Sequence, residues 1–322
     1  MRGLRRLLAA GFASCVALAA QSQAFPQKAV TFVVPYAPGG LPDTVARVVG
    51  QKLSDKWAQP VVVENKPGGN GVVAAQYLAS RPADGYTLMV TDGTMFSANP
   101  YLYASLPYDP QKDFAFVSLV ARAPLFLAVH PSLPASTFTE YVALVKSKPG
   151  TFSYGSSGIG SIHHLNMASI NASLGLDMLH VPFKGTGQSV PAVVSNQVSA
   201  VFSAMPSIAG FVKEGKLKLV AVNTARRSSF APGVATIAES SIPDFDFAPT
   251  IGVSGVASIP AAVVQKVSAD VAEVLRDPSL AERLVVLGIE PVGGNPAAYL
   301  AQVRDDRVRF ERAVKLAGAK GE

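Results

Sequence analysis

The sequence predicts an α/β protein made of two sets of strands and helices, each with a mostly parallel sheet flanked by helices. Short β-branched runs alternate with helical stretches, and this alternation restarts at about Phe116. The 322-residue chain is 49% hydrophobic and only 16% charged, so it has ample apolar surface for two cores. The same composition excludes disorder, collagen and coiled coil.

The N-terminal 24 residues are predicted to be a secretory signal peptide. Three arginines precede an apolar run over 7–20, and small residues stand at the cleavage positions Ser22 and Ala24. No later segment offers the roughly 20 apolar residues of a transmembrane helix, so an exported protein is expected. Cys15 is the single cysteine, which excludes disulfides and cysteine-ligated metals. An alternative is acylation of Cys15 at a loose lipobox, giving a lipoprotein.

Removing the leader also changes the charge. Three of the 28 basic residues lie in it, so the mature chain carries a net +3 instead of +6. No basic stripe interleaved with aromatics is present, and nucleic-acid binding is therefore not expected.

Each element follows from a local pattern. A β-branched run stopped by Pro35 predicts the first strand, and apolar residues at helical spacing after Asp43 predict the first helix. Strands are predicted over 29–34, 59–64, 87–91, 126–129, 152–154, 178–181, 200–202, 217–222 and 289–292. Helices are predicted from 43, over 72–79, 139–146, 162–174 and 190–196, from a Ser258 cap with Pro260 to Asp277, over a short stretch after it, and over 296–317.

The loop over 35–43 joins a strand to a helix and is a candidate ligand site. Its Tyr36, Pro38, Gly39 and Gly40 allow close backbone approach, and a helix start favours an anion. Asp43 is expected to cap the helix.

The second set of elements repeats this arrangement over 154–164. Ser156, Ser157 and Gly158 supply hydroxyl and amide donors, Ser161 is the expected N-cap, and His164 could face the cleft. A third strand-to-helix loop contains Phe183 and Lys184, and the lysine could attract an anion. A small ligand with carboxylate or amide ends, held between the two sets, is the expected occupant.

Enzyme motifs fail on spacing. No serine of the glycine–serine loops has a glycine both two residues before it and two residues after it, which a hydrolase elbow requires. The four histidines do not form a zinc-binding helix pair, so no metal and no cofactor is expected. The remaining enzyme alternative is a secreted serine hydrolase that uses Ser156 or Ser157 with His164.

These loops and their flanks resemble the Bug-type periplasmic solute-binding proteins of tripartite tricarboxylate transporters. The resemblance runs over nearly the whole mature chain. The segments that carry it are PQKAV (26–30), VPYAPGG (34–40), VVENKPG (62–68), ADGYTL (83–88), LPYDP (106–110), HVPFKG (180–185) and EPVG (290–293).

The resemblance implies a two-lobe Venus flytrap in the periplasm that binds one small carboxylate, delivers it to a membrane permease and performs no catalysis. It implies ligand contacts from the loop 36–40, from Thr94 and from the loop 156–161. Relatives commonly have an aspartate after the strand that ends at Phe202, where this chain has Ser203 and Ala204. Aliphatic or aromatic mono- and dicarboxylates are therefore expected rather than amino acids. Thr250 and Ile251 replace a common aromatic pair, which changes the hinge-side wall.

From these arguments lobe 1 is predicted to comprise residues 25–121 and 250–322, and lobe 2 residues 122–249, in a monomer with the ligand at the interface. A protein of this class could also serve a sensor system instead of a permease. The sequence does not separate these two roles.

Overall fold

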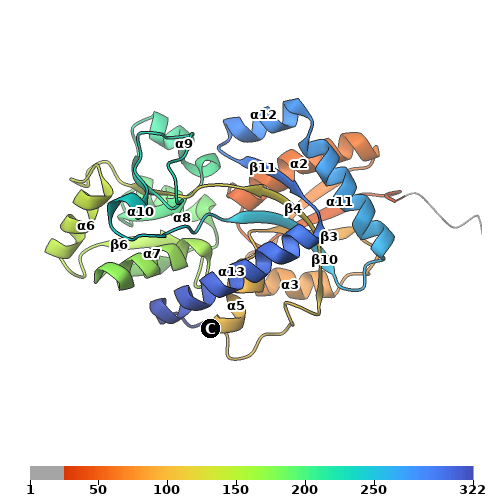
Figure 1. Ribbon diagram of the computed structural model, residues 1–322, viewed down its shortest axis with the longest axis horizontal. Helices are drawn as coiled ribbons and strands as arrows, with labels where there is room; N and C mark the ends of the chain where they lie inside the picture. Colours follow the sequence, from red (N-terminus) through yellow and green to blue (C-terminus); the bar gives the residue numbers. More distant parts are fainter. Residues whose placement is uncertain (1–24, 322) are drawn as a thin grey trace, which may run out of the picture.

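The structure, a computed structural model, describes residues 25–321. The predicted signal peptide and Cys15 lie outside the described residues. Two lobes, each a sheet with helices packed on it, lie side by side in Figure 1. The predicted two-lobe α/β class is thus confirmed.

Lobe 1 is built on a six-stranded sheet of order β11-β4-β10-β3-β1-β2. Its strands are β1 (Val30–Val34), β2 (Val61–Asn65), β3 (Thr87–Thr91), β4 (Phe114–Arg122), β10 (Thr250–Val256) and β11 (Glu290–Gly294). Lobe 2 is built on a five-stranded sheet of order β7-β6-β8-β5-β9. Its strands are β5 (Phe126–Val129), β6 (Ser153–Ser156), β7 (Leu179–Pro182), β8 (Ala200–Ser203) and β9 (Lys218–Val222).

Both sheets are mixed, which corrects the expectation of mostly parallel sheets. The βα units give parallel neighbours, β2-β1-β3 in lobe 1 and β7-β6-β8 in lobe 2. The strands next to the lobe crossings, β4, β5, β9 and β10, pair antiparallel with their neighbours. The reason is topological: the chain leaves lobe 1 along β4 and returns along β10, so these two strands run in opposite directions side by side.

Helices cover both faces of each sheet (Figure 1). In lobe 1 they are α2 (Leu41–Trp57), α3 (Val72–Ala79), α4 (Thr94–Ser97), α5 (Asn99–Leu102), α11 (Ala261–Leu275), α12 (Pro278–Val286) and α13 (Pro296–Ala317). In lobe 2 they are α6 (Phe138–Ser147), α7 (Ile162–Leu174), α8 (Thr186–Val194), α9 (Met205–Lys213) and α10 (Ile237–Ser240). The predicted Ser258 cap is wrong by two residues, because Pro260 is the N-cap of α11.

Strand periodicity explains this double cover. In β1, Phe32 and Val34 belong to a core with α2, whereas Val33 belongs to a second core with α3 and α4. In β5, Leu127 and Phe126 likewise enter different cores. Because alternate residues of a strand point to opposite faces, burying both sets requires helices on both faces.

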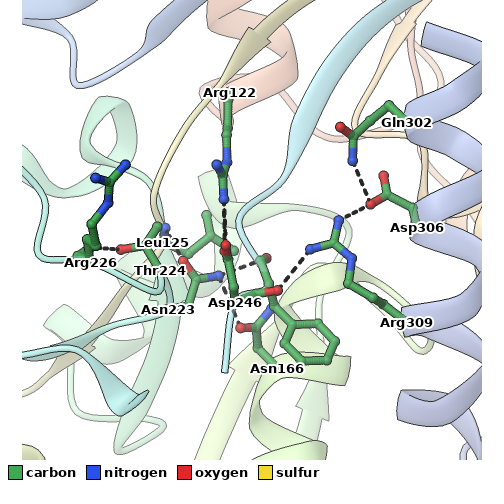
Figure 2. A network of polar contacts seen from close by, with 11 residues as sticks. Arg122, Leu125, Asn166, Asn223, Thr224, Arg226, Asp246, Gln302, Asp306 and Arg309 are labelled. Atoms are coloured by element: carbon green, nitrogen blue, oxygen red, sulfur yellow. Dashed lines mark hydrogen bonds and ion pairs between the residues drawn. The ribbon is translucent and has the colours of Figure 1, made fainter. Parts of the chain in front are cut away.

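Two segments cross between the lobes and run side by side. The first crossing, over 123–125, joins β4 to β5, and the second, over 246–249, leads from lobe 2 into β10. The Ala123 N–H donates to the Pro249 carbonyl at 3.2 Å, and the Asn223 N–H donates to the Leu125 carbonyl at 3.0 Å. Figure 2 shows that the Asn223 side chain ties these segments together: its Oδ1 accepts from the Leu125 N–H at 2.8 Å, and its Nδ2 donates to the Phe247 carbonyl at 2.9 Å.

The C-terminal helix α13 also contacts both lobes. It packs on β4 and α4 of lobe 1 and on α7 of lobe 2. From α13, Arg309 donates to the Asp246 carbonyl at 2.9 Å and pairs with Asp306 (Figure 2). The Asp246 carboxylate in turn accepts from Arg122, at the end of β4, at 2.8 Å. Hence Asp246 links the first crossing to α13.

Replacing Asn223 with alanine is expected to lower the free energy of unfolding by about 3 kcal/mol. The side chain is fully buried, and its loss leaves the Leu125 N–H and the Phe247 carbonyl without partners. Urea unfolding checks this. The neighbouring Thr224→Val change, which removes one hydrogen bond to the Arg226 carbonyl at a partly exposed position, serves as control and should cost less than about 1 kcal/mol. Equal effects of the two changes would contradict the assignment.

Candidate functional site

A cavity of 430 Å³ lies between the lobes. Lobe 1 lines it with Pro35, Tyr36, Gly68, Gly69, Asn70 and Tyr103. Lobe 2 lines it with Ser157, Gly158, Ile159, Pro182, Phe183 and Lys184. Each strand-to-helix loop singled out in the sequence thus contributes to one wall.

The first loop, over 35–43, is fixed in place by a side chain of helix α2. That helix begins at Leu41 with Gly40 as N-cap, so the expected Asp43 cap is wrong in detail. Asp43 instead reaches back and accepts the Gly39 N–H at 3.0 Å, together with Arg47 at 3.0 Å and Asn65 at 2.9 Å. Burial alone would raise the pKa of this carboxyl, but these hydrogen bonds lower it overall. A charged Asp43 therefore fixes the loop in place.

Tyr36 is fixed by a buried polar group. Its hydroxyl bonds both oxygens of Asp92 at 3.1 Å and lies 3.2 Å from Thr94 Oγ1, which itself donates to Asp92 at 2.8 Å. Burial, followed by the nearby Asp92 charge, raises the pKa of Tyr36, so the phenol stays protonated. Thr94 thus supports Tyr36 and is not among the residues that line the cavity.

In the lobe 2 loop the two serines have different roles. Ser156 is fully buried, and its Oγ accepts from the Gly158 N–H at 3.0 Å. Ser161 is the N-cap of α7, as predicted, and donates to the Gly158 carbonyl at 2.7 Å. Within residues 25–321 the Ser157 hydroxyl has no partner, which leaves it available to a ligand.

The histidines lie behind this loop. His164 Nδ1 accepts from the Gly160 N–H at 3.1 Å, and Ser156 Oγ lies 2.6 Å from Nε2 of His180, not from His164. Burial lowers the pKa of His164 to about 4, and burial together with His164 lowers that of His180 to about 3. Both imidazoles are therefore neutral near pH 7. The hydrolase pairing of Ser156 with His164 is not formed.

The lobes touch around the cavity. The Ala37 N–H donates to the Lys184 carbonyl at 2.8 Å, and Ser207 Oγ donates to the Gly39 carbonyl at 2.8 Å. On the other side Asn70 Nδ2 donates to the Gly160 carbonyl at 3.1 Å. The two lobes are thus joined by hydrogen bonds at separate places, and the arrangement is closed.

The cavity favours an anion. Lys184 carries the single charged side chain among the lining residues, and no carboxylate of residues 25–321 forms an ion pair with it. Among the lining residues the backbone N–H groups of Gly69, Asn70, Ser157 and Ile159 have no acceptor in that part of the chain. Free amides and a lysine are the groups that bind carboxylates. Aromatic and aliphatic side chains form the rest of the wall.

Five of the predicted site residues line the cavity: Tyr36, Ser157, Gly158, Phe183 and Lys184. The others support these walls from behind or lie at the lobe contact: Pro38, Gly39, Gly40, Asp43, Thr94, Ser156, Ser161, His164 and Ala204, the last as N-cap of α9. Sequence reasoning missed Gly68, Gly69, Asn70 and Tyr103. The turn-forming run 67–71 carried a signal for the first three, and Tyr103 carried none.

Known proteins with similar sequences and folds show which class of protein has this geometry. A protein of R. palustris, Rpa4515, solved with adipate, is 31% identical and superposes with a TM-score of 0.87 over 92% of this chain and 99% of its own. MatC of Rhodopseudomonas palustris, solved with malate, is 30% identical, with a TM-score of 0.83 over 90% and 100% of the two chains. Protein BugT of Bordetella pertussis is 28% identical over 95% of this chain and 94% of its own.

The fold and the cavity between the lobes define a solute-binding protein. The model of the tripartite tricarboxylate transporter family receptor, TctC, matches residues 45–318. The chain therefore belongs to this family, and the resemblance to the Bug-type proteins is confirmed. Within the described residues no helix is both long and apolar enough to cross a bilayer, and no His, Cys, Asp and Glu side chains cluster in a way that could hold a metal.

Proposed function

We propose that this protein captures a small carboxylate between its lobes in the periplasm and delivers it to the permease of a tripartite tricarboxylate transporter. The observation that carries the proposal is the cavity, which combines Lys184, free backbone amides and the Ser157 hydroxyl with an uncharged remainder. Adipate and malate in the two related structures support aliphatic carboxylates, and the family supports the permease as partner.

The proposed mechanism is closure without catalysis. A ligand that contacts both walls stabilises the closed arrangement over the open one, and this difference in affinity shifts the equilibrium. Sheet membership supports the proposed division at 249/250, where β10 begins, and favours a first division one residue later than proposed, because Arg122 still belongs to β4 of lobe 1. Full burial of Ser156 and its use within the loop argue against Ser156 as a hydrolase nucleophile. For Ser157, the bond of His164 Nδ1 to the Gly160 N–H argues against the same alternative, because it occupies a nitrogen that could act as the base. We expect the protein to act as a monomer.

Thermal unfolding of purified 25–322 with a panel of mono-, di- and tricarboxylates tests the proposal. A ligand at 100 times its dissociation constant stabilises the fold by about 2.7 kcal/mol, which gives a clear rise in Tm. Amides of the same acids serve as controls, because they keep the carbon skeleton and remove the charge. If no carboxylate raises Tm more than its amide does, the proposal is wrong.

The Lys184→Gln variant should weaken carboxylate binding about tenfold, or about 1.4 kcal/mol, because it removes the one positive side chain of the cavity wall. Calorimetric titration at two salt concentrations measures this, and the salt dependence of the wild type should decrease in the variant. Lys213→Gln, at the end of α9 and away from the cavity wall, is the matched control. An equal loss of affinity in both variants would show that Lys184 does not contact the ligand.

A further inference from the structure

His164 lies where the lobe 2 loop meets lobe 1. The residue is 7% exposed, and its ring stacks on His180 with ring centroids 4.0 Å apart and an interplanar angle of 18°. Its Nδ1 accepts the Gly160 N–H at 3.1 Å, and its own backbone N–H is capped by Ser161. The ring is thus held on α7, with one nitrogen committed to the loop.

Gly160 is in turn the residue of this loop that reaches the other lobe. Its carbonyl accepts from Asn70, which lines the cavity from lobe 1. Its φ of +78° suits glycine, and a Cβ there would lie 2.1 Å from Cδ1 of Leu102 in lobe 1. Two side chains from opposite lobes, His164 and Asn70, therefore hold the same glycine.

We infer that His164 is a positioning residue for ligand binding, which fixes Gly160 so that Ser157–Ile159 face the cavity and the Gly160 carbonyl meets Asn70 of the closing lobe. This inference rests on the proposed function, and it concerns a residue that does not line the cavity itself. The accepting atom must be an unprotonated Nδ1, so the neutral ring with its proton on Nε2 is the form that positions the loop.

The surroundings of His164 favour that neutral form. The titratable groups that face it are His180 on β7 and Tyr154 on β6, whose ring stacks at 6.4 Å. Burial raises the pKa of Tyr154, so it stays uncharged, and no carboxylate pairs with either imidazole within the described chain. Protonation of His164 would place two donors, Nδ1–H and the Gly160 N–H, against each other and release the loop.

Three variants test the inference without any ligand. His164→Asn keeps an acceptor near the Nδ1 position, His164→Phe keeps a ring and removes the acceptor, and His163→Leu alters the adjacent buried histidine, which makes no bond to the loop. Amide hydrogen exchange of a peptide covering 156–161, normalised to its intrinsic rate, is the measurement. At pH 7 we expect exchange at least tenfold faster in His164→Phe and near the wild-type rate in the other two. Equal protection in His164→Phe and the wild type would overturn the inference.

Hydrogen exchange of the same peptide measured as a function of pH provides a second test. As the pH falls toward 4, the wild-type loop should lose protection while His164→Asn, which cannot be protonated, keeps it. This comparison still decides the matter if His164→Phe does not fold. Parallel loss in both proteins would contradict a positioning role.

Measurements of ligand affinity distinguish a failure of this inference from a failure of the proposed function. With adipate and malate as probes, His164→Phe should bind at least tenfold more weakly than the wild type, and His164→Asn should recover most of the loss. If the wild type binds neither acid nor any other carboxylate, the proposed function fails, while the exchange results still decide the role of His164.

Discussion

A Gly187→Val variant is expected to lose at least 100-fold in ligand affinity and to remain open in the presence of ligand. Gly187 is the second residue of α8 in lobe 2, and a Cβ built on it lies 2.1 Å from the carbonyl oxygen of Pro38 in lobe 1. Because the blocking atom is backbone, it cannot rotate away as a side chain would. The closed arrangement therefore requires a residue without a Cβ at this position.

The loss in affinity follows from the smaller population of the closed form. When the binding-competent closed form becomes rare, the apparent dissociation constant rises by the inverse of its fraction, and a 100-fold rise corresponds to about 2.7 kcal/mol. The open form should remain stable, because the position is helical and valine forms helix better than glycine does. Calorimetric titration gives the affinity, and small-angle X-ray scattering with and without ligand reports closure.

Gly210→Ala provides the matched control for this variant. Gly210 lies in α9 of the same lobe, and apart from its chain neighbours and the backbone of its own helix no atom would come within 4 Å of its Cβ. This change should leave affinity and closure unaltered. Wild-type affinity in Gly187→Val, with normal contraction on ligand binding, would show that the contact between residue 187 and Pro38 is not part of the bound state.

Much of the fold was predictable from local pattern, although the strands β4 and β10 at the lobe crossings were not predicted. The β-branched run before Pro35 and the helical spacing after it gave β1 and α2, and the Ser161 cap was placed correctly. Strand direction was not predictable in the same way. A buried strand such as β10 has the same apolar composition whether its neighbour runs parallel or antiparallel, so only the path of the chain between the lobes decides it.

The site was predictable to a similar extent, since glycine-rich strand-to-helix loops mark where a backbone can approach a ligand. The contacts that the loops of the two lobes make with each other could not be predicted from the sequence. Asn70 and Gly160 are 90 positions apart in sequence, and the bond between them depends on how the two lobes close. Likewise, Ser156 and Ser157 are chemically identical in the sequence, and only the packing of β6 against β7 buries one and leaves the other at the cavity.

Buried histidines should make lobe 2 sensitive to acid. Burial lowers the pKa of His163 and His164 to about 4 and that of His180, also affected by His164, to about 3, from an ordinary value of 6.5. The unfolded chain therefore takes up protons as the pH falls below 6.5, and the folded chain does so only near 4. The stability due to neutral histidines is fully present above pH 6.5 and declines as the pH falls toward 4.

His163→Leu isolates one such contribution. The His163 ring is almost completely buried, and its Nδ1 has no partner in the described chain, so an apolar replacement leaves no polar group unpaired. For a shift from 6.5 to about 4, the wild type should lose roughly 2.5 kcal/mol more than the variant between pH 7.5 and pH 4.5. Urea unfolding at intervals across this range measures the difference.

The comparison with a variant is needed because other buried groups respond in the opposite direction. Burial raises the pKa of Asp92 and of Asp306, so acid relieves the cost of burying their charge and offsets part of the loss. Both carboxyls are present in the wild type and in His163→Leu, and their effect cancels in the difference between the two. Met167→Leu, at a fully buried position of the same helix, alters packing without removing a titratable group. It should lower stability by the same amount at every pH, whereas His163→Leu should gain on the wild type steadily from pH 6.5 downward. Parallel curves for all three proteins would mean that the pKa of His163 is the same in the folded and the unfolded chain, which would contradict the prediction.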